Sequence, residues 1–220
     1  MTFAPQASID HAALRHNLQQ VRQSAPRSRI WAVIKANAYG HGMPDVAHVL
    51  ADADGFAVAR LEEALRLRAF GSRKPILILE GVFTAEGLRQ AMAADCQLAL
   101  HQPEQLRLLE TAAQGRPPGA TLHRSSARVW LKVDTGMHRL GFRPAEVAGV
   151  AQRLRDCRGV SELQLMTHLA NADDRADPLT HAQCEAFDRL PLHLFDALSI
   201  ANSAGLMGFP CAVRDWVRPG

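Results

Sequence analysis

The sequence contains a series of short apolar segments in which apolar residues follow one another directly instead of alternating with polar ones. The segments are residues 30–35, 55–59, 75–80, 97–100, 129–133, 163–168 and 197–201, and residues 215–220 fit one further, very short strand. Strands with this pattern are buried on both faces, which is typical of parallel sheets. No other property of the sequence limits the fold as strongly.

Helical patterns fill the intervals between these segments. They cover residues 60–70, 84–94, 102–113 and 144–156, and a first helix is predicted after Asp10, with Leu14, Leu18 and Val21 at helical spacing. Strands that alternate with helices predict a parallel sheet. Eight strands would close a (β/α)8 barrel of the TIM type, with one helix before the first strand. An open doubly wound sheet is the alternative, although no G-x-G-x-x-G follows the first strand.

The segment 114–128 is rich in proline, glycine and serine. We predict that it forms a surface loop before the fifth strand, because the same alternation of strand and helix resumes after it. A domain boundary at this point is the less favoured interpretation. Residues 1–220 are therefore predicted to form one barrel domain.

Composition excludes several classes of protein. The net charge of +3 over 220 residues, with scattered arginines, does not fit a nucleic-acid-binding surface. No apolar segment approaches the roughly 18 residues of a membrane span, and the N-terminus lacks the pattern of a signal peptide. The four cysteines, Cys96, Cys157, Cys184 and Cys211, are widely spaced without a C-x-x-C pair. This spacing favours reduced thiols in the cytoplasm and no metal site.

Polar residues gather where the predicted strands end, which is where barrels of this class carry their functional side chains. They are Lys35, Tyr39, Lys132, Asp134, Arg139, His168, Asn202, Ser203 and Arg218. Cations, hydroxyls and backbone N–H groups suit a phosphate or carboxylate ligand. A lysine beside other cations has a lowered pKa and becomes a good nucleophile. This combination points to pyridoxal phosphate bound through a lysine, although the residues alone reach only a barrel enzyme with an anionic ligand.

The segment "AVIKANAYGHG" (32–42) closely resembles the cofactor-lysine signature of the alanine racemase family. Four further segments resemble that family in the same order: "WLKVDTGMHRLGF", "MTHLANADD", "IANSAG" and "DWVRPG". The resemblance covers nearly the whole chain and is closest to proteobacterial members. It implies a pyridoxal-phosphate barrel domain that takes part in the interconversion of L-alanine and D-alanine for peptidoglycan synthesis.

The resemblance also implies a role for each matching residue that contacts the cofactor. Lys35 would bind pyridoxal phosphate as a Schiff base and act as one of two acid–base groups. Tyr39, Ser203 and Gly220 would hold the phosphate, and Asn202 would line the cofactor site.

Four more residues receive a role from the resemblance. Arg218 would face the pyridine nitrogen and keep it unprotonated, and His168 would sit beside the ring and position Arg218. Arg139 would contact the phenolic oxygen of the cofactor and the substrate carboxylate. Lys132 would be a carbamylated lysine that orients Arg139. From the residues alone, a plain ion pair between Lys132 and Asp134 is an alternative interpretation of Lys132.

Family members continue past "RPG" into a C-terminal β-domain, and they form homodimers in which that domain supplies a tyrosine to the neighbouring active site. The present sequence stops at Gly220 and contains one tyrosine, Tyr39. On this resemblance, the 220 residues alone are expected to be inactive or weak. The alternative hypothesis is a non-catalytic, single-domain protein that carries pyridoxal phosphate. A fragment that serves only in assembly and a racemase of broad specificity are more distant alternatives.

Overall fold

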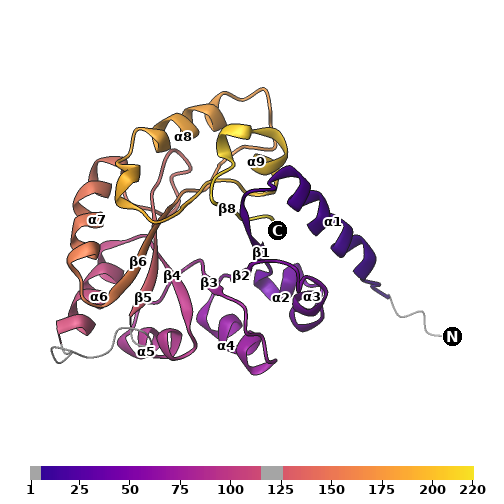
Figure 1. Ribbon diagram of the computed structural model, residues 1–220, viewed down its shortest axis with the longest axis horizontal. Coiled ribbons are helices and arrows are strands. Elements are labelled where there is room, and N and C mark those ends of the chain that lie inside the picture. The colour runs from indigo at the N-terminus through magenta and orange to yellow at the C-terminus, as the bar shows by residue number, and fades with distance from the viewer. Residues whose placement is uncertain (1–5, 115–125) are drawn as a thin grey trace.

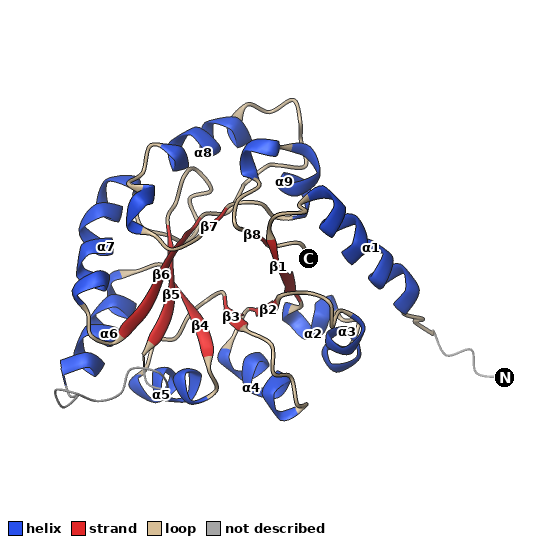
Figure 2. Ribbon diagram, viewed as in Figure 1, coloured by secondary structure: helices blue, strands red, loops and turns tan. Residues whose placement is uncertain are grey.

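The computed structural model describes residues 6–114 and 126–220 (Figure 1). Eight parallel strands form a closed barrel in chain order, and helices surround it (Figure 2). The strands are β1 (Arg29–Val33), β2 (Gly55–Val58), β3 (Ile76–Ile78), β4 (Cys96–Leu100), β5 (Ala127–Lys132), β6 (Val160–Met166), β7 (Leu198–Ser199) and β8 (Trp216–Val217). The pairing of β8 with β1 closes the ring. The predicted (β/α)8 barrel is confirmed, and the open sheet is ruled out.

The helix α1 (His11–Ser24) precedes β1, as predicted, and Asp10 caps it by accepting hydrogen bonds from the N–H groups of Ala12 and Ala13. The other α-helices are α2 (Lys35–Tyr39), α3 (Met43–Val49), α4 (Leu61–Ala69), α5 (Ala85–Ala93), α6 (Pro103–Gln114), α7 (Val147–Asp156), α8 (Leu179–Asp188) and α9 (Ser203–Gly208). The described part of the chain also contains the short 3₁₀ turns η2 (Pro144–Glu146), η3 (Leu192–Leu194) and η4 (Pro210–Ala212). Most of the loop predicted at 114–128 lies outside the described residues.

The interior of the barrel is filled by the three tryptophans of the chain. Trp31 and Trp216 stack with their ring centroids 4.3 Å apart, and Trp130 meets both edge to face. Small residues on the neighbouring strands make room for these rings: a Cβ added at Gly55 would collide with the Trp31 ring. This packing closes the barrel centre, so a ligand site must lie at one end of the strands rather than in a pore.

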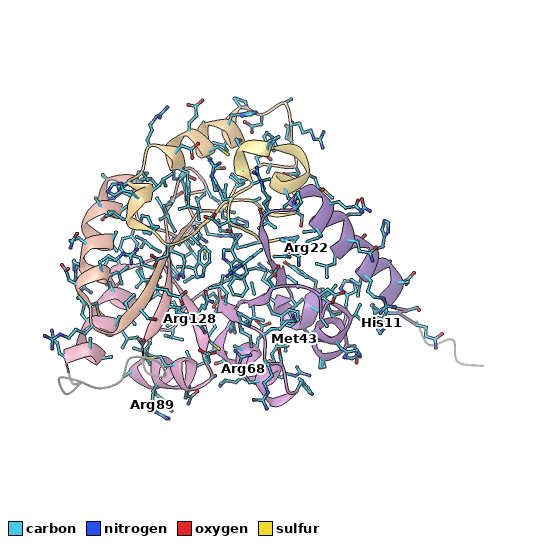
Figure 3. All side chains as sticks on the ribbon, in the orientation of Figure 1. His11, Arg22, Met43, Arg68, Arg89 and Arg128 are labelled. Carbon is cyan, nitrogen blue, oxygen red and sulfur yellow. The ribbon has the colours of Figure 1, made fainter. Side chains whose placement is uncertain are left out.

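Two arginines form structural hydrogen bonds at the amino ends of the strands. At the end where β4 begins, Arg68 and Arg128 both donate to the carbonyl oxygen of Asp95, each over 3.1 Å (Figure 3). Arg128 also forms an ion pair with the Asp95 carboxylate over 2.7 Å. These cations therefore hold the fold together. Among the helices that the structure describes, none is long and apolar enough to cross a membrane.

Candidate active site

A cavity of about 650 Å³ opens at the carboxyl ends of the strands. All of the residues to which the resemblance gives a role line it: Lys35, Tyr39, Lys132, Arg139, His168, Asn202, Ser203, Arg218 and Gly220. They lie at or after the ends of β1, β5, β6, β7 and β8, and the pairing of β8 with β1 brings the first and last of them together. Asp134 does not line the cavity, but the carboxylates of Glu80 and Asp173 do.

The sequence pattern placed Lys35 at the end of the first strand, and this prediction is wrong. Strand β1 ends at Val33, and Lys35 begins a short turn in which Ala36, Asn37, Ala38 and Tyr39 all have positive φ angles, between 52° and 56°. Left-handed helical conformation costs roughly 1–2 kcal/mol per residue for side chains other than glycine. Strain of this kind persists only where the surroundings hold it, and it is concentrated at functional sites.

Glu63 holds this strained turn and was missed as a site residue. Its Oε1 accepts a hydrogen bond from the Ala36 N–H over 2.6 Å, and its Oε2 accepts one from the Ala59 N–H over 2.8 Å. The carboxylate therefore ties the Lys35 turn to the end of β2. The sequence does contain a signal for Glu63, because the N–H of Arg60 also donates to it, as in a capping box at the start of α4.

Tyr39, Ser203 and Gly220 meet at one corner of the cavity. The N–H of Gly220 donates to the Ser203 Oγ over 3.0 Å. A Cβ built at Gly220 would lie 2.6 Å from the Tyr39 hydroxyl oxygen, so only glycine fits there. The Asn202 side chain lines the cavity and also caps α9, where its Oδ1 accepts from the Gly205 N–H over 2.9 Å. The corner thus combines two hydroxyls with a glycine backbone, which suits a phosphate group.

Arg218 is buried, with 5% of its surface exposed, and it immediately follows β8. Its guanidinium donates to the Ser199 Oγ and to the carbonyl oxygens of Thr167 and Ile200. Ser199 and Thr167 were not foreseen, because an apolar strand pattern gives no sign of its internal hydrogen bonds. Within residues 6–114 and 126–220, no carboxylate forms an ion pair with Arg218, and burial lowers its pKa to about 10.

Lys132 ends β5 and is also buried. Burial, followed by the charges of Arg218, Arg139 and Lys35, lowers the pKa of Lys132 to about 8. No ion pair joins Lys132 to Asp134 in the described part of the chain. The Asp134 Oδ1 instead accepts hydrogen bonds from the N–H groups of Gly136 and His138.

His168 lies two residues beyond the end of β6 and lines the cavity. Burial and then the charge of Arg218, with smaller effects from Lys132, Arg139 and Lys35, lower its pKa to about 3. The imidazole is therefore neutral near pH 7. Its backbone carbonyl accepts a hydrogen bond from the Gln183 side chain over 3.1 Å. The positioning of Arg218 by His168 stays a prediction, because the recorded partners of Arg218 are other residues.

The cavity therefore carries more positive charge than its carboxylates balance. Lys35, Lys132, Arg139 and Arg218 all line it. Of the two carboxylates there, Glu80 lies 3.7 Å from Arg60. Lys132 and Arg218 are buried, and buried charges are normally paired, so the cavity is suited to an anionic ligand. A pyridoxal phosphate fits these donors, because the corner formed by Tyr39, Ser203 and Gly220 suits its phosphate and Lys35 offers an amine to its aldehyde.

The fold and the site define a (β/α)8 barrel with a lysine-centred, cationic pocket at the carboxyl ends of its strands. The chain belongs to the family described as alanine racemase, N-terminal domain, which it matches over residues 9–220.

Curated relatives agree with this membership. The chain is 48% identical over 218 residues to an alanine racemase of Yersinia pestis, covering 99% of this chain and 58% of that protein. It is 50% identical over 217 residues to an alanine racemase of Nitrosococcus oceani, covering 98% of this chain and 58% of that protein. The chain thus spans a little over half the length of these relatives.

A solved structure supports the same placement. The biosynthetic alanine racemase from Pseudomonas aeruginosa superposes with a TM-score of 0.87 at 44% sequence identity, over 96% of this chain and 57% of that one.

Proposed function

We propose that residues 1–220 form the pyridoxal-phosphate-binding barrel of a racemase that interconverts L-alanine and D-alanine. The observation that supports this most directly is the convergence in one cavity of Lys35 with the buried Arg218, which has no carboxylate partner among the described residues. The family membership and the names of the relatives support alanine as the substrate. We further propose, from the family resemblance alone, that the protein acts in the cytoplasm as a homodimer with a shared active site and supplies D-alanine for peptidoglycan.

The residues of this chain divide the work between binding and proton transfer. The Lys35 amine would hold the cofactor, and the same amine would remove or return the proton on the substrate α-carbon. Tyr39, Ser203 and Gly220 bind the phosphate. Partial burial raises the pKa of Tyr39, so its hydroxyl stays a hydrogen-bond donor. When bound, the cofactor withdraws electrons from the α-carbon and so makes its proton acidic.

Two arginines set the charge around the reacting group. Arg139 lines the cavity mouth and binds the substrate carboxylate, for which a guanidinium is well suited. Arg218 donates to Ser199 and to the carbonyl oxygen of Thr167, and it would face the pyridine nitrogen of the cofactor. A cation at that position would disfavour protonation of the nitrogen, so Arg218 would favour rapid return of the proton over competing reactions.

Lys132 supports the site in a modified form. Its pKa of about 8 leaves part of its amine neutral near pH 7, and a neutral amine reacts with carbon dioxide to form a carbamate. The carbamate is an anion among cations, so it balances the buried charge and orients Arg139. A mass increase on Lys132 in bicarbonate buffer would support this step, and an unmodified Lys132 at every pH would contradict it.

Racemisation needs a second proton-transfer group opposite Lys35. Tyr39 is the sole tyrosine of the sequence and is engaged at the phosphate corner. In the family that the chain resembles, this second group is a tyrosine supplied by the neighbouring subunit, and we propose the same arrangement for this protein. With Lys35 alone, the barrel should exchange the α-proton of one alanine enantiomer with solvent but form little of the other enantiomer.

That partial reaction provides the test. Purified chain with pyridoxal phosphate is incubated with L-alanine or D-alanine in deuterium oxide, and the α-proton signal is followed by NMR while chiral chromatography measures inversion. We expect exchange of one enantiomer, slow inversion, and loss of exchange in Lys35→Ala. Cofactor binding without exchange of either enantiomer would favour the alternative, a non-catalytic carrier of pyridoxal phosphate. That alternative draws its support from single-domain barrels that bind the cofactor without a second domain.

A further inference from the structure

Two cysteines that are distant in the sequence meet on the outside of the barrel. Cys184 lies on α8 and Cys211 in η4, and their Sγ atoms are 3.0 Å apart although 27 positions separate them in the chain. A disulfide bond is about 2.05 Å long, so an approach of roughly 1 Å would turn this contact into a bond. The fold thus creates a thiol pair that the wide spacing of the cysteines did not predict.

The pair is reachable from solvent on one side. Cys184 is 2% exposed, whereas Cys211 is partly exposed. The imidazole Nδ1 of His181, an exposed residue, lies 4.0 Å from the Cys211 Sγ. Among the described residues, no group of three His, Cys, Asp or Glu side chains could hold a metal ion, so a zinc site does not explain the pair.

The other two cysteines have a different environment. Cys96 and Cys157 are both buried, and their sulfurs contact the backbone carbonyls of Ala94 and Leu109 over 3.6 Å and 3.8 Å. They therefore serve as internal controls for any reaction that depends on the thiol pair.

We propose that Cys184 and Cys211 form an oxidative modification site, at which a low-molecular-weight disulfide converts the two thiols into one intramolecular disulfide bond. The bond would close a covalent loop over residues 184–211. That loop contains Asn202 and Ser203, which line the candidate active site. The disulfide bond would therefore restrict the motion of the segment that contributes Ser203 to the phosphate corner.

The reaction balances in two exchange steps. The Cys211 thiolate attacks one sulfur of the reagent, the sulfur–sulfur bond of the reagent breaks, and one reagent thiol leaves with a mixed disulfide formed on Cys211. The Cys184 thiolate then attacks the Cys211 Sγ and displaces the second reagent thiol. The two protein thiols lose two electrons and two protons in total, and the reagent gains both as two thiols.

The environment of the pair sets the order of attack. Burial and the contact with Cys211 raise the pKa of Cys184 to about 12, so its thiolate is scarce. Cys211 is the more accessible sulfur and has the imidazole beside it. Cys211 should therefore react with the reagent, and Cys184 should react only with the mixed disulfide next to it.

The test uses the full chain treated with oxidised glutathione, quenched by alkylation, digested without reductant and analysed by mass spectrometry. We expect a linked peptide pair containing Cys184 and Cys211, lighter by two hydrogen atoms than the two free peptides and separated by dithiothreitol. Cys157→Ser, the matched control, should form the same link. Absence of the link in the folded wild-type chain, whether Cys211 carries glutathione or stays free, would overturn the proposal.

Single variants test the order of attack and do not depend on the cross-link itself. In Cys184→Ser, a glutathione adduct should accumulate on Cys211, because nothing displaces it. In Cys211→Ser, Cys184 should remain unmodified while circular dichroism shows the chain to be folded. A glutathione adduct on Cys184 in folded Cys211→Ser would overturn the assignment of Cys211 as the first reacting thiol.

Discussion

The hydroxyl of Tyr39 lies against the α-carbon of Gly220, where an added Cβ would stand 2.6 Å from the hydroxyl oxygen and 3.0 Å from the Cβ of Val33. Tyr39 belongs to the turn after β1, and Gly220 follows β8. The contact therefore joins the first and last strand ends of the barrel at the corner proposed for the phosphate.

Gly220→Ala should weaken the binding of pyridoxal phosphate by displacing the Tyr39 hydroxyl, because the added methyl group has no space. We expect a loss of roughly tenfold in affinity, equivalent to about 1.4 kcal/mol, with little change in folding. The affinity is measured by titrating the chain with pyridoxal phosphate and following the absorbance. Gly149→Ala is the matched control, since a Cβ at Gly149 meets nothing within 4 Å. Equal affinity in the two variants would show that Tyr39 does not depend on this contact.

Glu63→Ala should destabilise the Lys35 turn. The change leaves the N–H groups of Ala36, Ala59 and Arg60 without their carboxylate acceptor. The loss of hydrogen bonds to a charged group should reduce the free energy of unfolding by about 1.5–3 kcal/mol. Urea denaturation checks this, with the exposed neighbour Glu62→Ala as control. A variant as stable as this control would mean that the turn is held by other contacts.

The barrel could be predicted from the sequence because its signals are local and repeated. Segments such as "PILILE" and "VWLKV" are apolar on both faces, and only a parallel sheet covered by helices buries both faces. Closure of the sheet into a ring was harder to predict than the strands themselves. It depends on β7 and β8, which are two residues long and give almost no pattern of their own.

The candidate site was predicted from strand ends and from the resemblance, and the structure brings the chosen residues together. The details that were not predictable depend on backbone conformation and on contacts distant in sequence. Ala36 and Ala38 give no sign of left-handed backbone, because alanine favours right-handed helix. Two such contacts form only when the barrel is closed: the contact between Cys184 and Cys211 and the hydrogen bond from Arg218 to Ser199.

Lys132→Met should raise stability at neutral pH in buffer free of carbon dioxide. The pKa of Lys132 falls from 10.5 to about 8 on folding, mainly through burial. The folded state therefore binds its proton more weakly, a penalty of about 3 kcal/mol that is complete below pH 8 and disappears as pH rises to 10.5. The difference in unfolding free energy between variant and wild type should shrink over that window. A difference independent of pH would contradict the lowered pKa.

His168→Asn should make the chain less sensitive to acid. The pKa of His168 falls from 6.5 to about 3 on folding, because burial and the neighbouring cations disfavour its charged form. The unfolded chain then binds the extra proton first, so stability is lost as pH falls from 6.5 towards 3. The free energy of unfolding, measured by denaturation at several pH values in this range, should therefore decrease less steeply with falling pH in the variant. The exposed His193→Asn is the control, and identical slopes for both variants would contradict the prediction.

The proposed cofactor lysine, Lys35, can be tested directly because the sequence contains only three lysines: Lys35, Lys74 and Lys132. Lys74 donates to the Ala53 carbonyl oxygen over 2.7 Å and does not line the cavity, while Lys132 is buried within it. The chain is saturated with pyridoxal phosphate, reduced with borohydride to fix the cofactor covalently, digested and sequenced by mass spectrometry. We expect a single pyridoxyl label on Lys35 that disappears in Lys35→Ala. A label on Lys74 or Lys132, or no label on the folded chain, would contradict it.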